Sequence, residues 1–318
     1  MPDSATHIFF ARDALEKTKI NKLKITDNIH LYYLGAQGPD PFFYFNYAPW
    51  KDNLGVSKFG GIVHRTNTRD FFLTYMRHLK ENYTDEGFAF IAGWICHYAL
   101  DSTAHPYVFH VTGNYINEET IKYRGNHLAL EKAIDSIMIK ERGYKKFFFN
   151  PARFYKLKSI PNSIISILDK TFKEVYSVDN MGKIYAKAYK NFKNNLRIMQ
   201  YDPIGIKKLI FKFIDLFSRK SYHVYSNLSY FNNVKKGVDY RNLKKNTWNH
   251  PVFADEKSND SFVELFNKGV EKATKIIDDL PKYFNNDFDL YELFDNSSYE
   301  TGKDSSKTYI MTSFNSIL

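Results

Sequence analysis

The sequence predicts an all-α fold, a multi-helix bundle, and two observations support this. Apolar residues recur at intervals of three and four along most of the chain, as on the buried face of a helix. In addition, His97 and Asp101, and later His127 and Glu131, are spaced by four residues, so each pair projects from one helix face. If these faces pack together, with His105 nearby, three imidazoles and two carboxylates meet. The sequence therefore predicts a metal cluster between helices.

Composition indicates a globular protein. The 318 residues are 43% hydrophobic and 17% aromatic, enough for a large core, and the length alone allows about two domains. We expect a single helical domain over residues 1–285 and a weakly ordered polar tail over 286–318. Because Cys96 is the one cysteine, a disulfide framework and a cysteine zinc cluster are both excluded. Any metal must bind to His, Asp and Glu.

Charge and hydropathy leave the partners open. The net charge of +10 favours contact with phosphates of lipid or nucleic acid, but the lysines are scattered, and we favour a basic composition without a specific partner. The first fifteen residues lack the basic start and apolar run of a secretory signal, and no segment offers about eighteen uncharged apolar residues. We therefore expect a soluble cytoplasmic protein.

The first quarter of the chain supplies three candidate site residues. A helix over residues 6–17 carries His7 in its first turn, although a lone His there is more often incidental. After a short helix over 27–34, Pro39 and Pro41 hold Asp40 in an extended loop, where it is either a turn former or a rigidly presented carboxylate. The aromatics over 42–50 either pack under this loop or line a pocket mouth. His64 lies just ahead of a helix that continues to residue 82.

The central helix is expected over residues 85–105, with Pro106 ending it. Pro106 also pushes His105 out of ideal helical geometry, and this would turn His105 towards a different metal from the one at His97. The partner helix, 124–142, carries His127 and Glu131 on one face. An isolated pair of this kind is usually only a mild helix-surface interaction, but beside the first cluster it indicates metal binding.

Further helices are expected over 163–176, 181–199, 205–218 and 261–280. The segment 205–218 is basic and amphipathic, with Ile206, Ile210, Phe213 and Phe217 on one side. Such a helix lies either on an anionic membrane or with its apolar face in a bundle core. We favour the core.

The residues His7, Asp40, His64, His97, Asp101, His105, His127 and Glu131, in this order within the first 135 residues, resemble the ligand series of the zinc-dependent phospholipase C family. That family is similar in architecture to the single-strand-specific zinc nucleases. The resemblance implies a helical bundle with its site in a cleft between helices. It also implies three zinc ions, two of which share Asp101 as a bridging ligand. His97, His64 and Asp40 complete the first of these two, and His7 helps to hold the second. The third ion is held by His105, His127 and Glu131.

The implied activity is phosphodiester hydrolysis by a metal-bound hydroxide, since zinc lowers the pKa of bound water from about 15.7 to about 7 and neutralises phosphate charge. Asp40 is the candidate catalytic residue, orienting or deprotonating the attacking water. Secreted members of the family use an N-terminal tryptophan as a further ligand. Here the chain begins with Met1 and Pro2, and we expect an exposed Pro2 amine in that place.

The substrate stays open at this stage. A phospholipid is the first candidate, and the HxxxE pair at His127 favours it, with peripheral membrane contact. Pro41 stands where choline-selective members have an aromatic residue, and the aromatics over 42–50 would suit either a cation or a nucleobase. A single-strand nuclease acting on nucleic acid and a non-catalytic zinc-stabilised binding protein are the alternatives.

Overall fold

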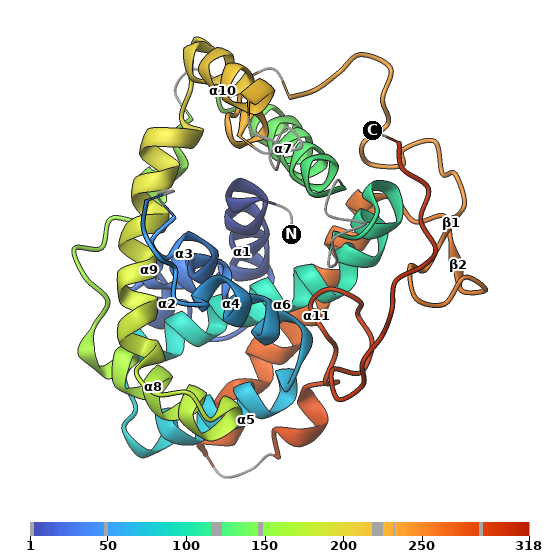
Figure 1. Ribbon diagram of the computed structural model, residues 1–318. Coiled ribbons are helices and arrows are strands. Elements are labelled where there is room, and N and C mark those ends of the chain that lie inside the picture. The colour runs from blue at the N-terminus through green and yellow to red at the C-terminus, as the bar shows by residue number, and fades with distance from the viewer. Residues whose placement is uncertain are drawn as a thin grey trace.

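A computed structural model of the protein describes residues 3–47, 50–115, 123–145, 149–217, 225–231, 233–285 and 289–317. Most of these residues are helical, which confirms the predicted all-α fold (Figure 1). Sheet structure in the described residues is limited to the antiparallel pair β1 (Trp248–Asn249) and β2 (Lys257–Ser258) and one isolated bridge. The helices are α1 (Ser4–Lys17), α2 (Leu23–Thr26), α3 (Ile29–Gly35), α4 (Val56–Arg65), α5 (Thr68–Glu81), α6 (Asp85–Thr112), α7 (Arg124–Glu141), α8 (Asn162–Tyr176), α9 (Met181–Asn195), α10 (Ile206–Phe217) and α11 (Phe262–Phe284).

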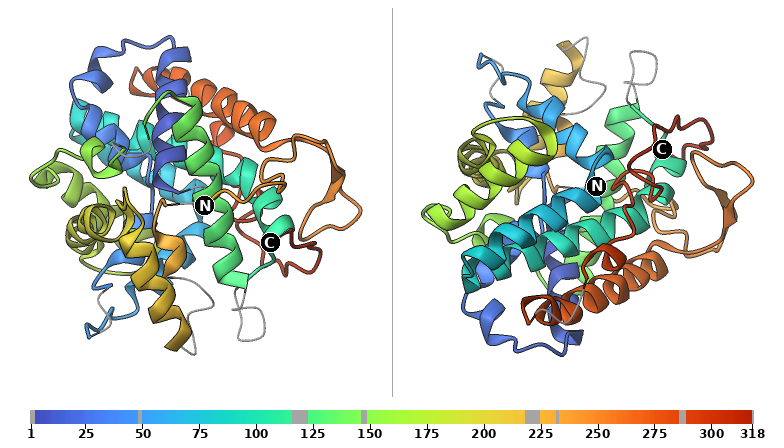
Figure 2. Two further views of the ribbon diagram at one scale, coloured as in Figure 1. Left: turned by 90° about the horizontal axis from the view of Figure 1, so that it is seen from above. Right: turned by 90° about the horizontal axis from the view of Figure 1, so that it is seen from below.

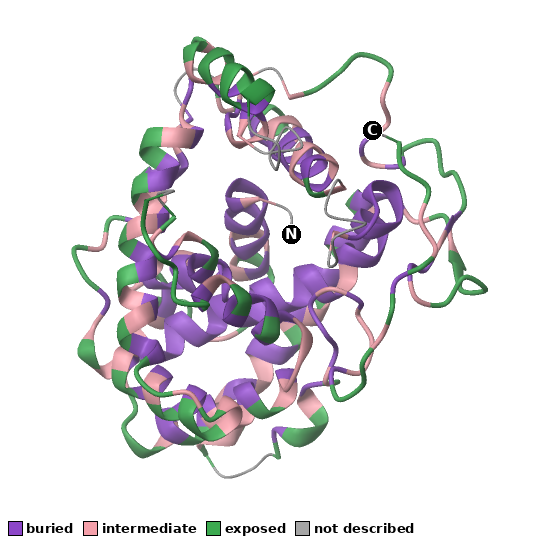
Figure 3. Ribbon diagram, viewed as in Figure 1, coloured by how far each residue is buried: buried purple, intermediate pink, exposed green. Residues whose placement is uncertain are grey.

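Helix α6 crosses the centre of the molecule and is buried along almost its whole length (Figures 1 and 3). Its N-terminus is capped by the Thr84 side chain, which accepts a hydrogen bond from the Gly87 N–H. The expectation that Pro106 ends this helix is wrong, because α6 continues to Thr112. Proline at this position leaves the Ser102 carbonyl without its helical donor. Gly302 fits against that carbonyl, and a Cβ on Gly302 would lie only 2.4 Å from the Ser102 oxygen.

Helix α3 crosses α6 with the two backbones nearly in contact. A Cβ built on Gly93 would lie 2.0 Å from the Tyr32 carbonyl oxygen, and one built on Gly35 would lie 2.0 Å from that of Phe90. Only glycine fits at these two positions. Since Gly35 ends α3, this crossing fixes where the chain leaves for the loop that carries Asp40.

The start of α1 is anchored to α7 by the buried carboxylate of Asp135. This carboxylate accepts hydrogen bonds from the Ala5 N–H at 3.0 Å, the Thr6 N–H at 2.9 Å and the Tyr230 hydroxyl at 2.7 Å. Next to it, Asp3 forms an ion pair with the buried Lys132. These bonds satisfy free N–H groups at the helix start and hold it beside the helix that carries His127.

The described residues after 288 pack against the helical domain. Phe294 and Tyr299 are fully or almost fully buried, and the Tyr299 N–H donates to the His64 carbonyl at 2.9 Å. The domain boundary near residue 285 stays a prediction. Although the segment after residue 288 is polar in composition, it contains buried aromatic residues that pack against the helical domain.

Helix α10 differs from the expectation. It lies at the edge of the molecule, and its apolar residues other than the buried Phe211 are exposed rather than packed in a core (Figures 1 and 3). Among the described helices, none combines the length and apolar character needed to cross a membrane.

Candidate metal centre

Five of the predicted ligands meet in one buried cluster around α6. Asp101 lies with its Oδ2 3.1 Å from His97 Nε2 and its Oδ1 3.4 Å from His7 Nε2. Asp40 Oδ1 is 3.2 Å from His64 Nε2 and 4.0 Å from His97 Nε2. The rings of His7 and His97 stack with centroids 4.4 Å apart. Three elements distant in sequence thus converge on the helical pair that spacing alone predicted.

Two of these residues reach the cluster from elements that differ from those expected. Asp40 is the first residue of a short 3-10 helix, Asp40–Tyr44, and does not lie in an extended loop. The turns that begin at Gly35 continue through Asp40, whose N–H donates to the Gln37 carbonyl at 3.0 Å. His64 lies in the last turn of α4, a helix that was not expected, and just ahead of α5 (Thr68–Glu81), the helix that was.

Gly38 permits the approach of the Asp40 segment to His97. It has a φ of +49°, and a Cβ at this position would lie 2.4 Å from His97 Cδ2. Its carbonyl accepts a hydrogen bond from the Tyr185 hydroxyl at 2.8 Å. The turn therefore packs directly against the His97 imidazole, and only glycine can occupy position 38.

The other three predicted ligands form a second group between α6 and α7. His127 Nε2 lies 2.9 Å from Glu131 Oε1, and the ring of His105 is 5.9 Å from that of His127. One ligand atom from each of His105, His127 and Glu131 lies within 4.8 Å of the other two. The expectation that His105 turns away from the His97 group agrees with this grouping, although Asp101 Oδ2 still lies 3.7 Å from His105 Nδ1.

Hydrogen bonds to the Nδ1 atoms orient three of the histidines. His64 Nδ1 lies 2.7 Å from the Gly60 carbonyl oxygen and His105 Nδ1 2.7 Å from that of Tyr299, while His97 Nδ1 lies 3.3 Å from that of Ala36. A carbonyl can only accept, so each Nδ1 carries the proton. The lone pair is then on Nε2, which is the arrangement of histidines that bind metal in proteins.

Several buried polar atoms in the clusters lack a hydrogen-bond partner within the described part of the chain. These are both oxygens of Asp101, Oδ1 of Asp40, Nε2 of His97 and His105, and both ring nitrogens of His7. Unpartnered buried polar groups are costly, by about 1–3 kcal/mol each. Nitrogen and oxygen atoms in this arrangement suit zinc, which would satisfy them together.

Burial sets the protonation of these groups. It lowers the pKa of His7 and His127 well below the usual value, lowers that of His64, and lowers that of His105 to about 3. These imidazoles are therefore neutral at pH 7 and ready to donate a lone pair.

The carboxylates divide into two kinds. Burial raises the pKa of Asp40 to about 8 and that of Glu131 well above its usual range. Burial acts in the same direction on Asp101, but His97, His105 and His7 outweigh it and hold the pKa of Asp101 well below the usual range. A bound cation favours the charged form of all three carboxylates.

Tyr299 is a component of the site that sequence reasoning missed. Its carbonyl holds His105, its N–H reaches the His64 carbonyl, and its ring lies 5.5 Å from the rings of both His64 and His97. Trp94 Nε1 donates to its hydroxyl at 3.1 Å. The sequence gives one indication of this role, because Tyr299 is an aromatic residue inside a polar segment.

The aromatics over 42–50 include one that packs in the core, as one of the two expected roles requires, and one that lies beside the first cluster. Phe42 is fully buried and packs edge-on against Phe59, Phe172 and Tyr185. Phe43 is 38% exposed, and its ring lies 5.3 Å from that of His64, beside the first cluster.

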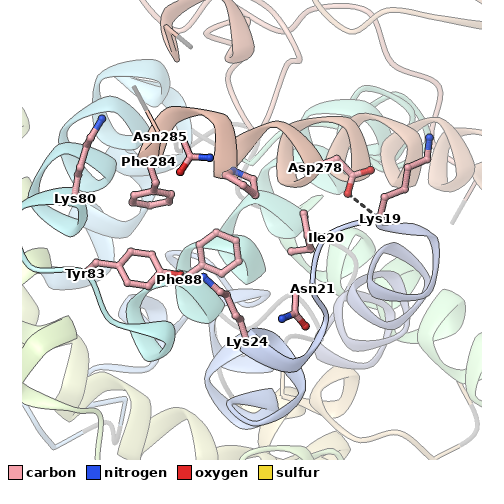
Figure 4. Close-up of a pocket in the computed structure, with 11 residues that line it drawn as sticks. Lys19, Ile20, Asn21, Lys24, Lys80, Tyr83, Phe88, Asp278, Phe284 and Asn285 are labelled. Atoms are coloured by element: carbon pink, nitrogen blue, oxygen red, sulfur yellow. Dashed lines mark hydrogen bonds between the residues drawn. The ribbon is translucent and has the colours of Figure 1, made fainter. Parts of the chain in front are cut away.

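Two features lie apart from the clusters. Pro2, the expected N-terminal ligand, is outside the described residues. An open cavity of about 700 Å³ lies between α2, α5, the start of α6 and the end of α11, with Lys24, Tyr83, Phe88 and Phe284 among its lining residues (Figure 4). None of the predicted ligands lines it. The chemistry of the clusters, and not the size of this cavity, identifies the candidate site.

A helical protein that gathers five histidines and three carboxylates in its interior belongs to the class of metal-binding proteins, and its donor atoms fit zinc. The family model for zinc-dependent phospholipase C matches residues 6–178, just over half of the chain. The chain belongs to the zinc-dependent phospholipase C family, which indicates a hydrolase activity of this type. The matched region contains all eight clustered residues. Comparisons with curated proteins and with solved structures gave no match.

Proposed function

We propose that this protein is a zinc-dependent phosphodiesterase of phospholipase C type whose substrate is a phospholipid or a related phosphodiester. The observation that carries this proposal is the convergence of eight buried nitrogen and oxygen ligands, in a chain of this family, with unpartnered atoms facing one another. A purely structural histidine cluster would normally pair its ring nitrogens with hydrogen-bond partners.

We assign the ligands to three ions. Asp40, His64, His97 and Asp101 would hold one, His7 and Asp101 a second, and His105, His127 and Glu131 a third. The two oxygens of Asp101 face different histidines, His97 and His7, and this supports its assignment as the bridge. The Nδ1 hydrogen bonds of His64 and His105 keep these rings aimed at their ions.

When bound, zinc would neutralise the phosphate oxygens and lower the pKa of water to about 7. The residues of the chain supply the positioning. Asp40 can bind through one carboxylate oxygen and accept the proton of the attacking water through the other. The fully buried walls of the cluster limit competing water.

The chain terminus is the proposed source of one more ligand. The bonds from Asp135 and Lys132 hold the first turn of α1 beside both clusters, and Pro2 precedes the described Asp3 by one residue. We propose that removal of Met1 frees the Pro2 amine to bind the ion at His7. Intact-mass measurement that finds Met1 retained in a fully metallated, active protein would refute this assignment.

The main experiment compares the wild type with Asp40→Asn and with Asp27→Asn, a control that removes an exposed carboxylate far from the clusters. Zinc content is measured by atomic spectroscopy, and hydrolysis is measured on a chromogenic choline phosphodiester, a short-chain phosphatidylcholine and single-stranded DNA. We expect Asp40→Asn to lower diester hydrolysis by about 10²-fold or more, since it removes a general base and weakens a ligand. Asp27→Asn should match the wild type.

The substrate panel separates the alternatives. Cleavage of the DNA with no cleavage of lipid would make the protein a nuclease. Full zinc occupancy without hydrolysis of any diester would make the cluster a stabilising element of a binding protein. Full activity of Asp40→Asn would show that Asp40 is not the base.

A further inference from the structure

Helix α10 is amphipathic, but unlike a helix in a bundle it exposes its apolar face to solvent. Its exposed side chains are apolar apart from Lys212, and they include Leu209, Phe213, Leu216 and Phe217, with 63–77% of each accessible to solvent. The side that faces the protein contains Asp215, whose carboxylate accepts hydrogen bonds from the backbone N–H groups of Tyr225 at 3.2 Å and Ser226 at 2.9 Å. The protein therefore attaches α10 through Phe211 and Asp215 and leaves the broader apolar side outward.

This orientation is fixed at the start of the helix. The buried Asp202 accepts hydrogen bonds from the backbone N–H groups of Gly205, Lys207 and Lys208 at 2.8–3.3 Å. The Ser229 hydroxyl also donates to Asp202, at 2.8 Å. A rotation that buried the apolar face would break these bonds together with those of Asp215.

A second apolar segment protrudes on the same side of the molecule. Trp50 is 82% exposed and Leu54 71% exposed, in the segment that leads into α4. Both views in Figure 2 show this blue segment and the gold helix α10 reaching out on one side. The segment continues into α4, whose last turn holds His64.

The charge around the apolar face is basic. Lys212 is exposed on the helix, whereas Lys207 and Lys208 are half-buried and donate to the Tyr201 carbonyl and to Asn233. The one acidic residue of α10, Asp215, is turned inward. An apolar face on a helix with three lysines and no outward acidic residue is suited to the boundary between acyl chains and anionic headgroups. Two separate protruding segments also fit a continuous, deformable surface better than the groove of a folded partner.

We propose that α10 and the segment of Trp50 and Leu54 form a docking surface for lipid bilayers that contain anionic phospholipids. The inference rests on the proposed function, because a docking surface of this kind would bring the protein to a phospholipid substrate. The apolar side chains enter the headgroup boundary, and the lysines contact lipid phosphates.

The test measures binding separately from hydrolysis. Sedimentation with vesicles of phosphatidylcholine and phosphatidylserine is compared for the wild type, the double variant Leu209→Ser/Phe213→Ser, and Leu23→Ser. Leu23 is a matched control, because it is 63% exposed on α2, which lies on the far side of the molecule from α10 (Figure 2). We expect the double variant to lose about tenfold or more in partitioning, and Leu23→Ser to lose nothing. Lys212→Gln should lower partitioning about fivefold.

Tryptophan fluorescence tests the second segment. Trp94 and Trp248 are buried, so a blue shift on vesicle addition, with quenching by brominated lipid, would report Trp50. Trp50→Phe should abolish the shift.

The outcomes for docking and for catalysis are distinguishable. If the double variant hydrolyses a soluble chromogenic diester like the wild type but fails to bind vesicles, docking is supported. If the wild type binds vesicles but cleaves no diester, the docking proposal is supported and the proposed function is refuted. A wild type that stays in the supernatant, or a self-association that the double variant abolishes, would overturn the docking proposal, the latter in favour of a second copy as the occupant.

Discussion

The protonation of Asp40 gives a quantitative prediction for zinc binding. Burial raises the pKa of this carboxyl to about 8, so at pH 7 about 90% of the metal-free protein carries a proton there. A carboxylate ligand must be ionised, so zinc must displace this proton. The displacement costs about 1.4 kcal/mol at pH 7, a tenfold lower affinity than above the pKa. Zinc affinity should therefore rise as the pH rises from 6 to 8.

Isothermal titration calorimetry in two buffers of different ionisation enthalpy measures the protons released. Asp40→Asn cannot bind or release a proton at this position. We therefore expect the variant to release about 0.9 fewer protons per protein at pH 7 than the wild type. Glu131, whose pKa burial also raises, is present in both proteins and releases its proton in each. Equal release by both proteins would mean that Asp40 is already ionised, and the reasoning from burial would be refuted.

Three further predictions concern the structure around the site. Chelation of zinc should lower the Tm by roughly 5–10 °C, with recovery on adding zinc but not magnesium, in a scanning fluorimetry measurement. Gly38→Ala should weaken zinc binding by about tenfold and lower the Tm, because the new Cβ meets the His97 ring at 2.4 Å, whereas Gly143→Ala, with positive φ but open space, should lower only the Tm. Partial burial raises the pKa of Asp295, but Lys272 and the Tyr98 hydroxyl outweigh it and hold it at about 2. The stabilisation by Asp295 is thus present above about pH 4 and lost towards pH 2. Asp295→Asn should flatten this part of the pH–stability curve in denaturant titrations, and an unchanged curve would contradict the assignment.

The sequence was sufficient to predict the helical class and the two helix-borne ligand pairs, because both depend on spacing. An interval of four along a helix places His97 beside Asp101 and His127 beside Glu131 whatever surrounds them. His7, Asp40 and His64 gave no such local signal. Their membership followed from the order of the ligand series, and the structure brings them to the same cluster.

The errors at Asp40 and Pro106 have a common cause. In both cases a proline was taken to dictate the local conformation, although neighbouring contacts decide it. Gly302 packs against the carbonyl that Pro106 leaves unpaired, so α6 can continue. The consecutive turns from Gly35 carry Asp40 into a 3-10 helix. Such contacts join residues far apart in sequence and leave no local pattern.

Helix α10 shows what periodicity leaves undetermined. The repeat of apolar residues correctly predicted a helix with two unlike faces, but it is the same whether the apolar face meets a core or the surroundings. The polar side decides the outcome here. Asp215 accepts hydrogen bonds from two backbone N–H groups of the segment 225–228, and Asp202 accepts hydrogen bonds at the helix start. If the helix turned to bury its apolar side, both carboxylates would lose these donors. The hydrogen bonds of Asp202 and Asp215, together with the buried Phe211, thus determine which face of α10 stays exposed.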